Sequence, residues 1–563
     1  MQVKRFKNNL AEDVFRRKYA QGVSDTWDAL AERVVEDVCG SRWGTTNKLM
    51  SDSDRDQLCD YIKRQLFFPG GRYLYYAGRP AKYFNNCYLL RAEEDTREEW
   101  SSLTWRAMSC LMTGGGIGID YSRLRAAGRT LARTGGVASG PIPLMHAINE
   151  IGRNVMQGGS RRSAIYASLN WKHEDTPEFL KAKNWHDQVV LPAITQWDIK
   201  QANFNHNAPL DMTNISVNYD DTIMHVSGAF GDIPMALKHS YIFIDNCRQA
   251  LMTGEPGFSF NFGDKENETL RNACTEITSE DDSDVCNLGS INMGNIESLD
   301  EFKAVVCLAS KFLVCGTLRA DLPYDKVYKV REKNRRLGLG LMGIHEWLLK
   351  RGQKYEVNIE LKKWLEVYKD ESKRSADEHC DRLYISTPKG YRAIAPTGTI
   401  GILACTTTGI EPIYAVAYKR RYLTDGTKWR YQYVIDAVAD RIIREFGVSP
   451  DSIETANHLV EDYERRIKFQ ADVQDYVDHA ISSTINLPPW GSKFNNEDGV
   501  ERFSHVLAKY APRLRGFTCY PAGSRGGQPI TEVEYNEAAG KTGVIYDEVD
   551  ICDITGHGGS CGV

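Results

Sequence analysis

An amide, a thiol and a carboxylate alternate in the segment around residue 274. Asn272, Cys274 and Glu276 stand two residues apart, so in an extended segment or a tight loop their side chains share one side. A thiol between a hydrogen-bonding amide and an acid/base group suits redox or radical chemistry. A second thiol, Cys286, follows twelve residues later in Val285-Cys-Asn-Leu-Gly-Ser-Ile-Asn292. The spacing therefore predicts a thiol-based redox or radical site.

Two further segments contain residues suited to chemistry. Cys87 lies in Asn85-Asn-Cys-Tyr-Leu-Leu90, before a strand-like run, and from these residues alone an ordinary strand cysteine explains it equally well. Ala395-Pro-Thr-Gly-Thr-Ile400 is a turn before an apolar segment. Such a turn presents backbone N–H groups and hydroxyls at the start of a helix, where phosphate binds readily. Turns of this kind are common, so the segment alone is a weak indication.

Composition excludes several classes of protein. The chain has 563 residues, of which 42% are hydrophobic and 26% charged, as in soluble globular proteins. Its net charge of -5 gives no electrostatic case for binding nucleic acid. We find neither a signal peptide nor an apolar run near 18 residues, so we expect a cytoplasmic protein without a membrane span. Its 14 cysteines form no Cys-x-x-Cys pair, so we expect no structural zinc and mostly reduced thiols.

The pattern along the chain predicts an α/β core. Residues 1–68 have helical periodicity, and residues 69–540 alternate short apolar runs with helical segments. Residues 541–563 form a glycine-containing tail that we expect to be flexible. Periodicity does not give the number of strands. The predicted strands lie at 114–120, 164–169, 212–217, 257–261 and 393–396, and two amphipathic helices at 358–384 and 431–446.

The pattern Asn-x-Cys-x-Glu, followed by Cys-Asn-Leu-Gly-Ser-Ile, resembles the finger loop and following strand of ribonucleotide reductases. The similarity runs in collinear order from about residue 10 to the tail. It implies a ten-stranded α/β barrel with a central finger loop. It also implies that Cys274 is the transient thiyl radical that abstracts the ribose 3′ hydrogen. Glu276 would be the base for the 3′-hydroxyl, and Asn272 would hydrogen-bond the ribose hydroxyls.

The same resemblance assigns the remaining thiols and the substrate-binding residues. Cys87 and Cys286 would supply two electrons to remove the 2′-hydroxyl and would end as a disulfide. Cys552 and Cys561 would re-reduce that disulfide by thiol exchange, although nine residues separate them, more than in the usual close pair. The predicted substrate-binding residues are Asn86, Pro396, Thr397, Gly398, Thr399 and Ile400.

Two glycine-containing loops resemble the parts of these reductases that read the effector and the base. They are Thr134-Gly-Gly-Val-Ala-Ser-Gly-Pro141 and Gln157-Gly-Gly-Ser-Arg-Arg-Ser-Ala164. The resemblance implies a deoxynucleoside triphosphate such as dTTP, or ATP, as effector, and a homodimer. Thioredoxin or glutaredoxin would be the external reductant. The predicted effector contacts are Asp95, Arg133, Gly158, Gly159, Arg161 and Arg162.

Two segments bear on the source of the radical, and they favour different sources. Asn-Ala-Cys-Thr-Glu differs from the Asn-Pro-Cys-Gly-Glu usual in adenosylcobalamin-dependent enzymes and favours a metal-containing, ferritin-like small subunit. Gly516-Phe-Thr-Cys-Tyr-Pro-Ala-Gly-Ser-Arg525 instead resembles the Thr-x-Tyr-x-x-Gly-Ser-Arg of the cobalamin enzymes. The compact chain, without an ATP-cone, resembles cyanophage reductases, which would act in the host cytoplasm. We therefore expect a small subunit with Tyr520 as radical relay, no metal in this chain, and adenosylcobalamin as the alternative.

Two other functions stay open from the sequence. One is a catalytically inactive nucleotide-binding regulator on the same fold, against which the retention of every catalytic residue argues. The other is a thiol hydrolase using Cys274, which needs a histidine base; His146, His186 and His239 stand in no recognisable motif.

Gly114-Gly-Gly-Ile-Gly118 is similar to a dinucleotide-binding loop but lacks the helix-opening Gly-x-Gly-x-x-Gly. In the reductases, the corresponding glycines line the barrel.

Overall fold

The computed structural model describes most of the chain. The described residues are 5–41, 48–132, 134–155, 164–184, 209–225, 231–424, 428–522, 530–542 and 544–547; at residues 286, 420–424, 428–429, 530 and 545–547 the description is confined to the backbone. Within these ranges, no helix combines the length and apolar content needed to cross a membrane.

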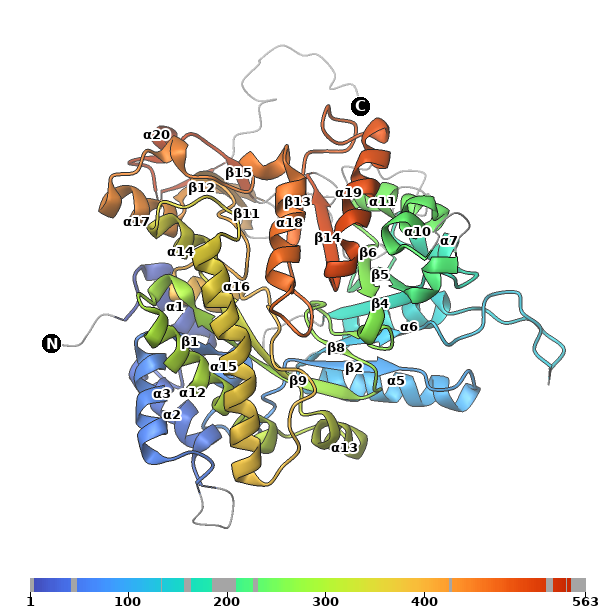
Figure 1. Cartoon of the computed structure of the whole chain (residues 1–563), viewed down its shortest axis with the longest axis horizontal. Coiled ribbons are helices and arrows are strands. Elements are labelled where there is room, and N and C mark those ends of the chain that lie inside the picture. Colours follow the sequence, from blue (N-terminus) through green and yellow to red (C-terminus); the bar gives the residue numbers. More distant parts are fainter. Residues whose placement is uncertain are drawn as a thin grey trace.

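The largest sheet of the described residues has ten strands, in two groups of opposite direction (Figure 1). Strands β2 to β6 run parallel to one another, while β9 is antiparallel to β2 and β14 is antiparallel to β6. The strands are β1 (Phe67–Pro69), β2 (Cys87–Arg91), β3 (Gly116–Asp120), β4 (Ile165–Asn170), β5 (Thr213–Asp220), β6 (Gly257–Asn261), β9 (Asp284–Asn292), β10 (Leu337–Met342), β13 (Thr484–Leu487) and β14 (Gly516–Pro521).

Backbone hydrogen bonds connect the two ends of this sheet. Residues 390–394 pair with β10 on one side, where Leu339 N donates to Tyr391 O at 3.1 Å. On the other side, Ser482 N donates to Ile394 O at 2.8 Å, just before the chain enters β13. The segment 393–396, predicted as a strand, thus makes single bridges rather than a ladder. The sheet curls into a barrel, and the predicted ten-stranded α/β barrel is confirmed.

Helices from the N-terminal region and from the middle of the chain form a layer against one side of the barrel (Figure 1). Their starts are capped by side chains that accept a backbone N–H: Thr26 for α2, Ser298 for α12 and Asn358 for α15. Trp27 anchors α2 by donating to Ile62 O at 3.0 Å. The helices are α1 (Asn9–Lys18), α2 (Trp27–Cys39), α3 (Asp52–Lys63), α12 (Leu299–Arg319) and α15 (Ile359–Leu383).

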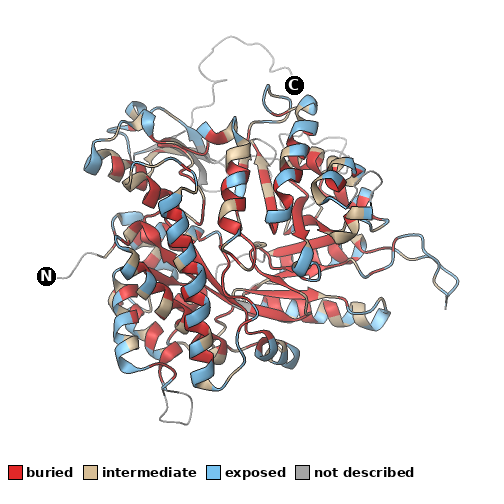
Figure 2. Ribbon diagram, in the orientation of Figure 1, coloured by how far each residue is buried: buried red, intermediate tan, exposed pale blue. Residues whose placement is uncertain are grey.

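Burial follows this arrangement (Figure 2). The barrel strands are buried along almost their whole length, as in β10, where all six residues are buried. The helices are buried on the face that packs inward and exposed on the other (Figure 2). Because β1 pairs with β9, the sheet begins across the predicted boundary at residue 68; the division into 1–68, 69–540 and 541–563 stays a prediction.

A second sheet was not foreseen. It has four strands among the described residues, in the order β15-β11-β12-β16. Strand β12 (Lys428–Ile435) overlaps the start of 431–446, which we predicted to be one amphipathic helix. That prediction is wrong for the first part, because β12 covers it and helix α17 begins only at Ala437. The strands are β11 (Ala417–Thr424), β12 (Lys428–Ile435), β15 (Ile530–Glu532) and β16 (Ile545–Asp547), and the helix is α17 (Ala437–Phe446).

Candidate active site

Cys274 lies at the tip of a short hairpin. Strands β7 (Leu270–Arg271) and β8 (Thr278–Ser279) pair antiparallel, so residues 272–277 form the finger loop between them. Thr275 has a left-handed backbone, with φ of 69°, which a non-glycine residue adopts rarely. Its N–H donates to Asn272 O at 3.0 Å and closes the turn. The half-buried Cys274 therefore lies between a buried Asn272 and a buried Glu276.

Glycines on strand β3 make room for this loop. A Cβ on Gly118 would overlap Arg271 O, and a Cβ on Gly116 would come within 2.9 Å of Ala273 Cβ. Real Cβ atoms keep a larger separation, so any other residue at these positions would push the loop away. The glycine-rich segment before Asp120 is thus explained by the close approach of the finger loop to the barrel wall.

Cys87 and Cys286 face each other across two neighbouring strands. They are direct partners in the antiparallel ladder between β2 and β9. Directly opposed residues in such a ladder have Cα atoms about 4.5–5.5 Å apart, within the range that a disulfide spans. A Cβ on Gly116 would lie 3.3 Å from Cys87 Sγ as well as close to Ala273. The Cys87 thiol and the finger loop therefore meet at the same glycine.

Two amides near the loop have polar atoms that could receive a ligand. Asn272 Oδ1 accepts from Ile277 N at 2.9 Å, while its Nδ2 is buried without a partner in the described part of the chain. Asn86 Oδ1, in the residue before Cys87, is also buried without such a partner. A buried polar atom is costly unless something bonds to it. These two atoms are therefore suited to hydroxyl groups of a bound molecule.

Arg271, at the base of the loop, was missed by the sequence analysis. Its guanidinium is buried and donates to Leu270 O at 3.1 Å, Asn261 Oδ1 at 2.6 Å and Arg515 O at 3.0 Å. Burial, reinforced by the neighbouring Arg515, lowers the pKa of Arg271 to about 9. Its charge is satisfied mainly by carbonyl oxygens, so it fixes backbone positions around the loop.

The predicted phosphate turn begins a short helix, α16 (Gly398–Ala404). Thr397 has a left-handed backbone, with φ of 50°, and its Oγ1 accepts from Gly409 N at 2.9 Å. The space around Gly398 is open, since a Cβ there would meet nothing within 4 Å. Pro396 is exposed and Ile400 is buried. Phosphate binding at this turn stays a prediction.

The remaining predicted residues are only partly within the described ranges. Asp95 accepts from Arg125 N at 3.0 Å, so a structural partner already holds its carboxylate. Tyr520, on β14, is half-buried and borders a hollow of about 240 Å³. Arg133, Gly158, Gly159, Arg161, Arg162, Cys552 and Cys561 lie outside the described residues.

Comparison with known proteins identifies a family. Residues 85–236, 243–363 and 389–511 match the family described as ribonucleotide reductase, barrel domain. The vitamin B12-dependent ribonucleoside-diphosphate reductase of Mycobacterium tuberculosis (strain CDC 1551 / Oshkosh) is 26% identical, over 89% of this chain and 75% of that protein. A putative adenosylcobalamin-dependent ribonucleoside-triphosphate reductase of Mycobacterium phage D29 is 28% identical, over 77% of this chain and 69% of that protein.

Solved structures show the same fold. A B12-dependent (class II) ribonucleotide reductase has a TM-score of 0.69 at 16% identity, over 95% of this chain and 94% of that chain. The class Id ribonucleotide reductase alpha subunit of Actinobacillus ureae has a TM-score of 0.68 at 15% identity, over 92% of this chain and 99% of that chain.

These comparisons correct the expected radical source. We expected a metal-containing, ferritin-like small subunit, with adenosylcobalamin as the alternative. The relatives that match over most of the chain are named as dependent on vitamin B12 or adenosylcobalamin. The small-subunit interpretation is therefore wrong. It rested on Ala273 and Thr275 beside Cys274 and on the resemblance of the compact chain to cyanophage reductases, whereas the similarity to the cobalamin enzymes extends along the chain.

Proposed function

We propose, since this chain belongs to the ribonucleotide reductase barrel family, that it reduces ribonucleotides to 2′-deoxyribonucleotides by a thiyl radical at Cys274, with adenosylcobalamin as the radical source. The observation that carries the proposal is the meeting of Cys87 and the Cys274 loop at Gly116, with Cys286 directly opposite Cys87. Three cysteines from separate segments thus converge inside one barrel. The names of the relatives support the cofactor.

Each cysteine has a separate task in this proposal. Cys274 removes the ribose 3′ hydrogen atom and returns it after reduction, so it is not consumed. Cys87 and Cys286 together give two electrons and two protons; the 2′-hydroxyl leaves as water and the two thiols become a disulfide. Glu276 takes the proton of the 3′-hydroxyl, and the Nδ2 of Asn272 donates to a ribose hydroxyl. The buried site keeps water from the radical.

The hollow beside Tyr520 fits part of the proposed cofactor. Tyr414, Asn457, Asn486 and Tyr520 supply polar groups, and Val460, Leu487 and Pro488 supply apolar surface, a combination that suits a nucleoside. The finger loop reaches the start of the same strand, where Thr275 Oγ1 lies 4.0 Å from a Cβ placed on Gly516. Tyr520 lies four positions further along the strand than Gly516, or about 13 Å. When bound there, adenosylcobalamin would supply the radical chemistry, and the Cys274 thiol would give up its hydrogen atom.

Further parts of the proposal concern regulation and partners. We propose that a deoxynucleoside triphosphate such as dTTP selects the substrate through the residues around Asp95 and the loops at 134–141 and 157–164. A homodimer, the Thr397–Ile400 turn as phosphate site, and re-reduction through Cys552 and Cys561 by thioredoxin or glutaredoxin belong to the same proposal. The family resemblance supports each of them.

The test is reduction of a radiolabelled ribonucleotide by the purified chain, with dithiothreitol and an effector. We expect turnover when adenosylcobalamin is added and none without it. Diphosphate and triphosphate substrates should be compared, because the relatives include a reductase of each kind. The proposal is overturned if adenosylcobalamin gives no deoxyribonucleotide with either substrate.

A further inference from the structure

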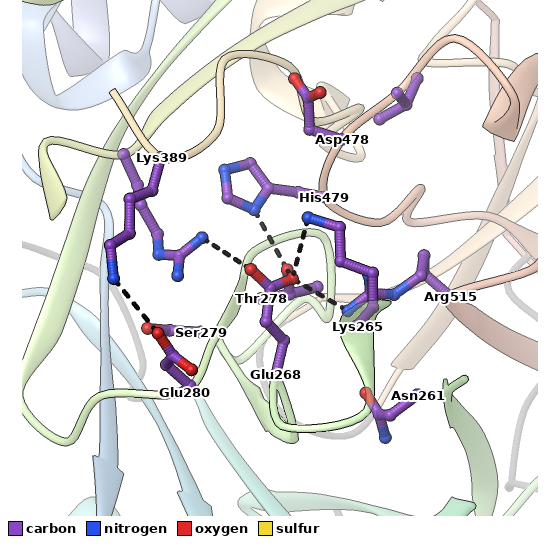
Figure 3. Close-up of polar contacts among 12 residues, drawn as sticks. Asn261, Lys265, Glu268, Thr278, Ser279, Glu280, Lys389, Asp478, His479 and Arg515 are labelled. Carbon is purple, nitrogen blue, oxygen red and sulfur yellow. Dashed lines mark hydrogen bonds and ion pairs between the residues drawn. The ribbon is translucent and has the colours of Figure 1, made fainter. Parts of the chain in front are cut away.

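Both legs of the finger loop end in a buried ionic cluster at one end of the barrel (Figure 3). Glu268 lies two residues before β7, on the first leg. Its Oε2 accepts a hydrogen bond from Oγ1 of Thr278, on the second leg, at 2.8 Å. A single carboxylate therefore connects the two legs beneath the tip that carries Cys274.

The same carboxylate is tied to the barrel wall. Arg336 Nη1 lies 3.1 Å from one oxygen of Glu268, and Arg515 Nη2 lies 3.1 Å from the other. Arg336 immediately precedes β10, and Arg515 immediately precedes β14. Arg336 also donates from Nε to Asp284 Oδ2 at 2.8 Å, at the first residue of β9. The loop is thus attached to the starts of three strands that run in one direction.

The charges in this cluster are strongly compensated. Burial would raise the pKa of the Glu268 carboxyl, but Arg336, Arg515 and Lys265 outweigh it and hold that pKa well below its usual range. Glu268 is therefore an ionised acceptor at any working pH. Because the Thr278 hydroxyl gives its only hydrogen to Glu268, the hydroxyl oxygen is left to accept from a second group.

His479 is that second group. Its ring is buried, and Nδ1 lies 3.2 Å from Thr278 Oγ1. Burial, with the nearby Arg336, lowers the pKa of His479 well below its usual value, so the ring is neutral. The neutral ring must carry its hydrogen on Nδ1 to donate to the hydroxyl. Thr278 therefore has both a fixed acceptor and a fixed donor, which determine where β8 begins.

We propose that Thr278 and Glu268 are positioning residues, which set the orientation of the Cys274 thiol by clamping both legs of the finger loop to the barrel wall. The inference rests on the proposed function and adds to it. Hydrogen-atom transfer requires close placement of sulfur and substrate, and a displacement of about 1 Å can reduce a rate about 100-fold. Six residues between two fixed legs leave the loop few alternative positions.

The chain offers a matched control on the same leg. Glu280 lies two residues after Thr278 and pairs with Lys389 at 3.1 Å (Figure 3). Their side chains are 43% and 38% exposed, so this pair is screened by solvent and fixes little. A change at Glu280 therefore tests whether any disturbance near the loop has the same effect as one at Thr278.

The experiment compares T278V, T278S and E280Q in the full-length chain by hydrogen–deuterium exchange and by kinetics. T278V keeps the shape of the side chain and removes the hydroxyl, while T278S retains it. We expect T278V to speed exchange of the amides in 272–277, including those of Thr275 and Ile277, about tenfold. We also expect kcat to fall about 30-fold with KM within about twofold. T278S and E280Q should match the wild type in both measurements.

The exchange measurement separates this inference from the proposed function. Unchanged exchange in 272–277 for T278V would overturn the clamp, whatever the activity. If the wild-type chain reduces no ribonucleotide, the proposed function fails, and exchange alone still decides whether the clamp exists. Faster exchange with unchanged kcat would show that the clamp orders the loop without positioning the thiol, and would also overturn the inference.

Discussion

Cysteines come together in two regions of the described chain, and only one of them is the proposed radical site. Within the barrel, Cys87 and the loop of Cys274 meet at Gly116, and Cys286 is the strand partner of Cys87. Within the helical layer, Cys39 of α2 contacts Cys315 of α12. Cys315 Sγ lies 3.4 Å from His379 Nε2 on α15. The second group has the thiol and histidine of a conventional thiol enzyme.

The difference lies in what surrounds the sulfur atoms. Burial would raise the pKa of Cys315, but hydrogen bonds from Cys39 and His379 outweigh it and lower that pKa. Arg382 donates to His379 Nδ1 at 3.4 Å, which leaves hydrogen on Nε2 for the sulfur. These contacts favour a thiolate, whereas abstraction of a hydrogen atom requires an S–H bond that can be broken and re-formed. The comparison shows that the contacts which stabilise a thiolate differ from those expected around a thiol that exchanges a hydrogen atom.

The largest expected effect concerns Cys274. The change C274S removes the only group in the proposal that can abstract the 3′ hydrogen, so kcat should fall at least about 1,000-fold. The matched change in the helical layer, C315S, should leave kcat unchanged at temperatures well below unfolding. Ribonucleotide reduction with circular dichroism as a folding check measures both. Retained activity in C274S, or loss confined to C315S, would reverse the roles of the two regions.

The second prediction concerns which thiols become oxidised. After turnover without an external reductant, peptide mapping should find a disulfide between Cys87 and Cys286, because these residues are direct partners in a strand ladder. Cys39 and Cys315 should remain unoxidised, since both are fully buried and take no part in the proposed reaction. A Cys39–Cys315 disulfide formed in step with product would contradict the assignment.

Much of the barrel could be predicted from local patterns. The strand predicted at 257–261 has the bounds of β6, and the helix predicted at 358–384 nearly coincides with α15. In β6, Phe258 and Phe260 alternate with Ser259 and Asn261, as in a strand, and a long surface helix repeats every 3.6 residues. The error at 431–446 has a visible cause: Trp429, Tyr431 and Tyr433 alternate with the polar Arg430 and Gln432, a strand pattern that was taken for helical periodicity.

The candidate site also has a part that could be predicted from the sequence and a part that could not. Asn272, Cys274 and Glu276 could be found because they share one short motif. The cluster of Glu268, Arg336, His479 and Arg515 could not, because these residues are spread over almost 250 positions and meet only where several strands begin. In the sequence, nothing distinguishes any of these four from the other charged or polar residues of the chain. Only closure of the barrel brings their charges into contact beneath the loop.

The third and smallest expected effect is a pH dependence of the free energy of unfolding, which arises from His479 in the cluster beneath Cys274. Burial keeps His479 neutral in the folded chain, while in the unfolded chain its pKa is about 6.5. As pH falls below about 6.5, the unfolded state takes up a proton that the folded state does not, so the free energy of unfolding decreases. The expected loss approaches 1.4 kcal/mol per pH unit for this residue. His345, whose pKa burial lowers to about 3, adds a loss of the same sign.

Thermal unfolding between pH 7.5 and 5 measures this decrease, and H479Q is the variant that isolates it. Glutamine does not titrate and can still donate to Thr278, so the stability of H479Q should depend less steeply on pH than that of the wild type. H345Q should likewise make stability depend less steeply on pH. It should not affect hydrogen exchange in 272–277, because His345 contacts a different segment, where its Nδ1 accepts from Ile413 N. A wild-type stability that stays level from pH 6.5 to 5 would mean that His479 can be protonated in place. The ionic cluster beneath the finger loop would then tolerate an additional positive charge, and its strict charge compensation would be refuted.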